Sequence, residues 1–95
     1  MTMAIDDTPE ALELVGDDLI RGRKEELLER MEEIARWRSL ASDEVSAMGQ
    51  QIKRWNGSSA YDRSEYVLRY RRLSALLRRS DRASRTLNAE LARRM

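Results

Sequence analysis

The sequence predicts an all-α fold: an antiparallel helical hairpin of the coiled-coil type with a short N-terminal helical segment. Charged residues make up 37% of the 95 residues, with one proline and four glycines, a composition typical of long solvent-exposed helices. Two long segments repeat apolar residues at alternating spacings of four and three, and an Asn-Gly pair separates them. A chain of this length forms one domain, so we expect residues 1–95 to make a single hairpin domain.

The N-terminal part carries a helix-start signal after an expected flexible tail over residues 1–8. Thr8 can cap a helix, and Pro9 fits the first helical position because no hydrogen-bond donor is needed there. Gly22 follows, and a glycine inside a helix costs about 1 kcal/mol relative to alanine. We therefore expect a first helix over residues 9–55, with Gly22 as a possible kink or break.

The first long segment has an apolar seam sustained for about four heptads. Arg38 is its only polar member, and we predict that its aliphatic stem lies along the seam while its guanidinium reaches toward Asp81. The seam residues are Leu27, Met31, Ile34, Arg38, Ala41, Val45, Met48, Ile52 and Trp55.

A turn over residues 56–61 ends this helix. Gly57 can adopt the left-handed conformation that closes a helix, and Asp62 with Glu65 has the form of a capping box. The second helix is therefore expected over residues 62–93. Its seam residues are Tyr66, Tyr70, Leu73, Leu77, Ser80, Ser84, Leu87 and Leu91.

Folding the two helices back on each other predicts specific neighbours. A short loop forces an antiparallel arrangement, which brings Trp55 near Tyr66 at the turn. Farther from the turn, Arg38 meets the small Ser84. Large residues then pair near the turn, and small residues leave space for the arginine.

The net charge of +1 hides two opposed halves. Residues 1–48 hold 13 acids and 6 bases, a balance of −7, whereas residues 49–95 hold 4 acids and 12 bases, a balance of +8. Helical geometry places the charges opposite each seam. We call Arg71, Arg78, Arg82 and Arg85 the basic stripe, and Glu25, Glu29, Glu32 and Asp43 the acidic stripe.

Three interpretations of these stripes remain open. In the first interpretation, both stripes are simply solvated surfaces, and Glu26–Arg30 and Glu32–Arg36 are ordinary ion pairs one helical turn apart. Alternatively, they meet between copies in a head-to-tail contact that builds a ring or a filament. In the third interpretation the basic stripe contacts the phosphates of a nucleic acid.

Several apolar residues fall partly or wholly outside the seam, which indicates surplus apolar surface. A homodimeric four-helix bundle or a partner helix would cover it, because an isolated helix pair is marginally stable. The alternative is that the segment Pro9–Ile20 folds over these residues and makes a three-helix domain. The predicted association residues are Trp37, Leu40, Leu68 and Leu76.

The composition argues against most catalytic chemistry. The chain has no cysteine and no histidine, so it lacks thiolate nucleophiles, imidazole bases and the usual zinc ligands. We expect no enzyme activity, no metal, no cofactor and no small-molecule substrate. All-helical chorismate mutases are similar in size, but they break into a third helix, and this sequence offers no helix breaker after Gly57.

No apolar run approaches the roughly 20 residues of a membrane span, so no membrane association is expected. The N-terminal MTMAIDDTPE carries acids where a secretory signal carries bases. The sequence therefore predicts a cytoplasmic protein, or one exported without a cleaved signal peptide.

Trp55-Asn56-Gly57 between two helices resembles the WXG family of small type VII secretion hairpins. The likeness extends to Ala60-Tyr61 after the tripeptide and to Tyr70 in the second helix. The resemblance implies export without a cleaved signal and dimerisation into a four-helix bundle. It also implies that Trp55 and Gly57 belong to a recognition surface.

The predicted function is a non-enzymatic assembly or adaptor protein that self-associates or binds a helical protein partner. A WXG-like secreted dimer and a secretion chaperone are examples. The alternative is a ring-forming nucleic-acid-handling protein, such as a phage DNA-packaging component similar to the small terminase subunit, which uses its arginine-rich helix.

Overall fold

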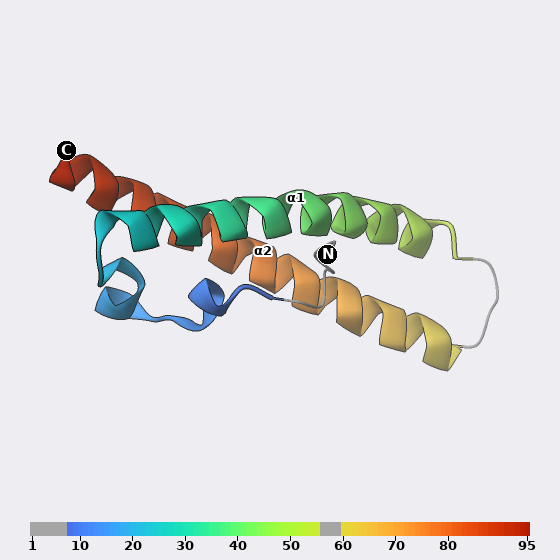
Figure 1. Ribbon diagram of the computed structural model, residues 1–95. Helices are drawn as coiled ribbons and strands as arrows, with labels where there is room; N and C mark the ends of the chain where they lie inside the picture. Colours follow the sequence, from blue (N-terminus) through green and yellow to red (C-terminus); the bar gives the residue numbers. More distant parts are fainter. Residues whose placement is uncertain (1–7, 56–59) are drawn as a thin grey trace.

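The protein is an all-α hairpin of two long antiparallel helices, α1 (Lys24–Lys53) and α2 (Ala60–Arg94) (Figure 1). This computed structural model describes residues 8–55 and 60–95. The molecule is elongated, with extents of 55 × 28 × 17 Å. The two helices lie side by side, and the predicted antiparallel hairpin is confirmed.

The N-terminal segment departs from the prediction of one helix over residues 9–55. It forms two short 3-10 turns, η1 (Glu10–Glu13) and η2 (Gly16–Ile20), and α1 begins only at Lys24. Gly22 has a φ of 116°, a left-handed conformation that favours glycine. A β-carbon there would approach Glu26 Oε2 to 2.5 Å. Gly22 is therefore a break, and the chain folds back along the hairpin (Figure 1).

The helix ends near the turn differ slightly from the prediction. The Arg54 backbone N–H still bonds to the carbonyls of Gln50 and Gln51, at 3.1 and 3.2 Å. α2 starts at Ala60, so Asp62 lies inside the helix and is not its cap. Of the turn predicted over residues 56–61, residues 56–59 lie outside the described residues, including Gly57, and residues 60 and 61 belong to α2. Residues 1–7 of the tail predicted over residues 1–8 also lie outside the described residues.

The core lies to one side of the predicted seam. Every seventh residue of α1 is fully buried, whereas the seam residues between them, such as Val45 and Ile52, are only half-buried. The same holds on α2, where Tyr70 and Leu77 are half-buried. The fully buried series on α1 consists of Leu27, Ile34, Ala41 and Met48.

The fold-back of the N-terminal segment explains this displacement. Leu12 and Leu19 are 2% and 5% exposed and belong to the same buried cluster as Trp37, which has no exposed surface. The segment therefore covers one side of the hairpin, but it does so as two 3-10 turns and not as the third helix of the three-helix alternative. Assigning Trp37 to an exposed association surface is wrong, because the segment contributes to the cluster that buries it.

Two neighbour predictions are confirmed. The Trp55 and Tyr66 rings lie 5.6 Å apart between centroids, at an interplanar angle of 44°. Arg38 Nη2 donates to Asp81 Oδ1 at 3.3 Å. Both contacts follow from the antiparallel register of the two seams.

Candidate functional site

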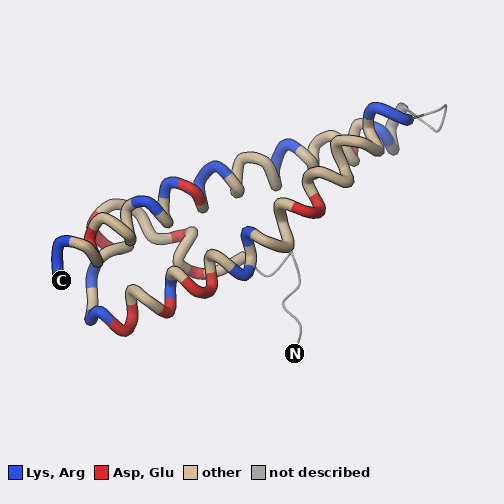
Figure 2. Tube along the Cα trace, turned by 90° about the horizontal axis from the view of Figure 1, so that it is seen from above, with Lys and Arg blue, Asp and Glu red and all other residues tan. Residues whose placement is uncertain are grey.

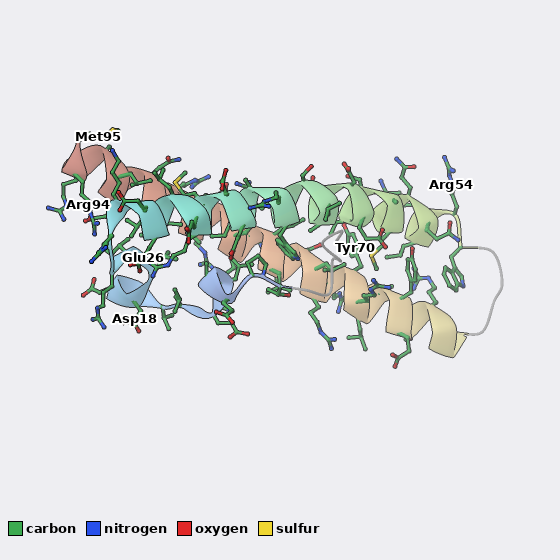
Figure 3. All side chains as sticks on the ribbon, viewed as in Figure 1. Asp18, Glu26, Arg54, Tyr70, Arg94 and Met95 are labelled. Carbon is green, nitrogen blue, oxygen red and sulfur yellow. The ribbon has the colours of Figure 1, made fainter. Side chains whose placement is uncertain are left out.

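No described element covers the side of the hairpin opposite the N-terminal segment. We call this side the open face, defined by half-buried seam residues that pack at the edge of the core. Figure 3 shows one of them, Tyr70, between the two helices in the half near the turn. The open face consists of Met31, Val45 and Ile52 of α1 and Tyr70 and Leu77 of α2.

Small residues of α1 form a shallow groove along the open face. Two hollows follow one another along it, one beside Tyr70 and the other beside Leu77. The small residues recur at alternating spacings of four and three, so the heptad pattern of the sequence already carries a signal for this groove. The small residues are Ala35, Ser39, Ser42, Ser46 and Gly49.

All four arginines of the basic stripe are exposed on α2. Arg85 pairs with Asp81 at 2.7 Å, one turn earlier in the same helix. Arg78 and Arg82 line a common hollow with Leu77, so this part of the stripe borders the open face. Figure 2 shows basic and acidic residues distributed unequally along the two helices. The acidic stripe is likewise exposed, on α1.

The remaining predicted association residues lie elsewhere. Leu40 is 39% exposed and Leu68 is 54% exposed, while Leu76 is half-buried against the core. None of them lines the groove of the open face. The structure thus separates them from the open face, and it places Trp37 in the core.

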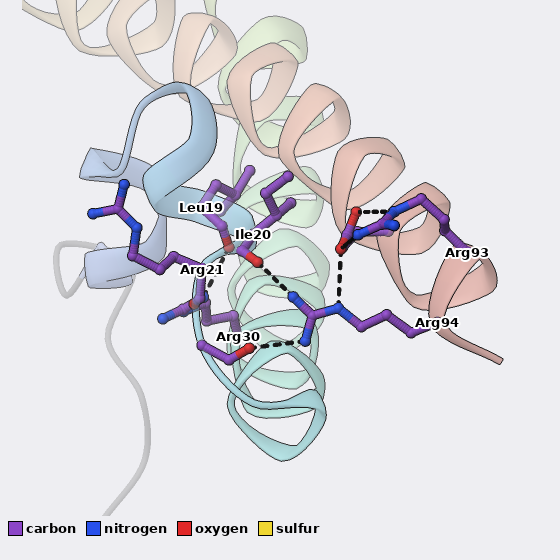
Figure 4. A network of polar contacts seen from close by, with 8 residues as sticks. Leu19, Ile20, Arg21, Arg30, Arg93 and Arg94 are labelled. Atoms are coloured by element: carbon purple, nitrogen blue, oxygen red, sulfur yellow. Dashed lines mark hydrogen bonds and ion pairs between the residues drawn. The ribbon is translucent and has the colours of Figure 1, made fainter.

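Two arginines clamp the chain where it enters α1 (Figure 4). Arg94 of α2 donates to the carbonyls of Ile20 and Gly22 at 2.9 and 2.8 Å. Arg30 of α1 donates to the carbonyls of Leu19 and Arg21 at 2.8 and 2.6 Å. Four consecutive carbonyls, from Leu19 to Gly22, therefore have guanidinium partners, and both helices hold the N-terminal segment in place.

Glu90 orients this clamp. Its carboxylate is buried and accepts hydrogen bonds from Arg93 Nε at 3.0 Å and Arg94 Nε at 2.9 Å. These bonds, first that of Arg93 and then that of Arg94, lower the pKa of Glu90 from its usual 4.5 to about 2. The group is therefore structural, because its partners are the protein's own arginines.

We expect the contribution of Glu90 to the free energy of unfolding to change with pH only between about 4.5 and about 2. The folded-state pKa is depressed, so the contribution is complete above about pH 4.5 and is lost as the pH falls toward about 2. The check is thermal unfolding of the wild type and Glu90→Gln across this range. The difference between their melting temperatures should be constant at neutral pH and shrink below about 4.5. A difference independent of pH would contradict the assignment.

No group of three or more His, Cys, Asp or Glu side chains in the described residues could hold a metal ion. Within the same residues, no helix is both long and apolar enough to cross a membrane. The surfaces described above consist of charged and half-buried apolar side chains.

The fold and these surfaces define the class of protein: an all-α helical hairpin with an N-terminal segment clamped against one side. No family model matches the chain, and neither the curated proteins nor the solved structures contain a match to it.

Proposed function

We propose that the protein is a non-enzymatic assembly protein whose open face binds the open face of a second copy. One observation carries this proposal: on both helices the seam residues that face away from the N-terminal segment are half-exposed. Val45, Ile52, Tyr70 and Leu77 contribute apolar surface that a second hairpin would bury. Such burial stabilises by about 25 cal/mol per Å² of apolar surface.

The groove suits a helix as the occupant. Helix axes pack 8–10 Å apart depending on the side chains at the contact, and small residues allow the closer distances. Ser42, Ser46 and Gly49 would let a helix of the second copy lie close to α1. The product is a four-helix bundle, the common solution for paired hairpins.

The charges favour a two-fold axis along the length of the hairpin. Such an axis places α1 of each copy over α2 of the other, so each acidic stripe approaches the partner's basic stripe. Asp43 and Arg78 lie at similar positions along the long axis of the hairpin, because Val45 and Leu77 face each other in the antiparallel register. In this contact both copies use the same surface, so the assembly is complete with two copies. The head-to-tail contact considered from the sequence would instead build a ring or a filament.

The resemblance around Trp55 to the WXG family supports the same proposal, because those hairpins form dimeric four-helix bundles. On that resemblance, export without a cleaved signal peptide is the cellular role that we propose for the dimer.

The test is a bulky charge placed in the groove. Wild-type protein should have a mass by light scattering of twice the 11.1 kDa of one chain, falling toward one chain as salt screens the stripes. Ser46→Arg, in the groove, should be monomeric. The matched control is Ala47→Arg, an exposed neighbour about 100° farther around the helix, which should remain dimeric. A wild-type monomer at high concentration would refute self-association.

A second candidate function is nucleic-acid handling. Arg71, Arg78 and Arg82 are exposed, and within the described residues no carboxylate lies in ion-pair distance of them. If they contact phosphates, duplex DNA should bind with an affinity that falls steeply with salt, and Arg71→Glu with Arg78→Glu should abolish binding. Fluorescence anisotropy with a labelled duplex measures this. Absence of binding by the parent protein at low salt would exclude this candidate.

A further inference from the structure

The groove filled by the N-terminal segment continues past the end of that segment. The segment packs against the half of α2 far from the turn, where Arg79, Ala83 and Thr86 lie beside Leu12 and Leu19. The described part of the segment begins near the middle of the hairpin and runs away from the turn (Figure 1). Within residues 8–55 and 60–95, nothing from the N-terminal segment covers the turn half of this side.

Heptad spacing places a second pocket on this side. Seven residues make almost two helical turns, so Arg72 lies on the same side as Arg79, and Arg69 lies on the same side as Ala83, two heptads later. We call the hollow at this position the turn pocket. It is lined by Trp55, Glu65, Tyr66, Leu68, Arg69 and Arg72.

The turn pocket has unmet binding capacity of two kinds. Trp55 Nε1 is buried and has no hydrogen-bond partner among the described residues, and an unpaired buried donor costs about 1–3 kcal/mol. Leu68 is 54% exposed beside it. A ligand that accepts one hydrogen bond and buries an apolar side chain would satisfy both.

The N-terminal segment indicates what kind of ligand fits this side. It buries Ala11, Leu12 and Leu19 against the helices and leaves its carboxylates exposed. The segment itself lies beside two arginines of α2, Arg79 and Arg82. Arg69 and Arg72 repeat this basic border at the turn pocket. The four exposed acids are Glu10, Glu13, Asp17 and Asp18.

We propose that the turn pocket binds an acidic, leucine-bearing segment of a partner protein, adjacent to the chain's own N-terminal segment. A leucine of the partner packs on Tyr66 and Leu68, a backbone carbonyl accepts the Trp55 indole N–H, and a carboxylate faces Arg72. The site lies on the side opposite the open face, so it is a second surface and does not depend on self-association.

The experiment uses the full-length ¹⁵N-labelled protein and a synthetic peptide with the sequence of residues 8–20 as the probe. The two tryptophan indole signals report on different places, since Trp37 is in the core and Trp55 is in the turn pocket. We expect a saturable shift of the Trp55 signal with the Trp37 signal unchanged. A peptide with glutamine and asparagine in place of its acids should bind at least tenfold more weakly.

Matched protein variants locate the contact. Arg72→Glu should abolish the Trp55 shift, whereas Arg63→Glu should not, because nine residues place Arg63 on the opposite side of α2. The proposal is overturned if the Trp55 signal does not move, or if the neutral peptide binds equally well. It is also overturned if the Trp37 signal moves with it, since the peptide would then be displacing the protein's own segment.

Discussion

Replacing Trp37 by alanine should lower the free energy of unfolding by about 3–5 kcal/mol, the usual cost of deleting a fully buried large aromatic side chain. Trp37 has no exposed surface and belongs to the cluster that joins Leu12 to the hairpin. The cavity would open where both helices and the N-terminal segment meet, so none of the three can close it alone. Urea unfolding followed by circular dichroism measures the change.

The matched control is Leu40→Ala. Leu40 follows Trp37 by three residues and is 39% exposed, so its truncation should cost less than about 1 kcal/mol. If Trp37 were instead an association residue, Trp37→Ala would weaken dimerisation and leave the stability of the single chain nearly unchanged. Equal costs for the two substitutions would contradict the burial of Trp37.

Leu12→Ala should cost about 2–5 kcal/mol, although Leu12 lies in a single 3-10 turn. A short 3-10 turn has little stability of its own, so its order depends on packing. Leu12 is 2% exposed and is the largest fully buried side chain of the N-terminal segment. Losing it should therefore release the segment and expose Trp37 to water.

Two measurements distinguish this effect from general destabilisation. Val15→Ala is the control, because Val15 lies three residues later and is 69% exposed; its cost should stay below about 0.5 kcal/mol. Amide hydrogen exchange in Leu12→Ala should accelerate first in η1 and η2, before the paired helices open. Unchanged exchange in η1 and η2 would show that Leu12 does not anchor the segment.

Much of the hairpin could be predicted from the sequence because its determinants are local. The spacing of Leu27 to Ile52 specifies a helix with one apolar side, and the antiparallel register then follows from a short connection. That register was sufficient to predict both the Arg38–Asp81 bond and the Trp55–Tyr66 contact. Each of these two contacts depends only on the positions of its two residues within regular, antiparallel helices.

The N-terminal segment could not be predicted in the same way. Pro9 and the acids after it are typical of a helix start, but a helix continuing through Gly22 would carry Leu12 and Leu19 away from the core. Folding back buries both side chains, and Arg30 and Arg94 then satisfy the carbonyls at the break. This stabilisation comes from contacts between residues far apart in the chain, and local helix propensity contains no information about such contacts.

The sequence by itself determined that the chain is all-α, that two long helices form an antiparallel hairpin and which residues form their seams, because helical periodicity is a local property. Only the tertiary structure decided which side of that seam is buried. The seam is symmetric in sequence, and Trp37 is in the core while Val45 and Tyr70 are half-exposed because a third segment packs on one side. Long-range packing thereby assigned the core to one side of the hairpin, and no described segment covers the other side.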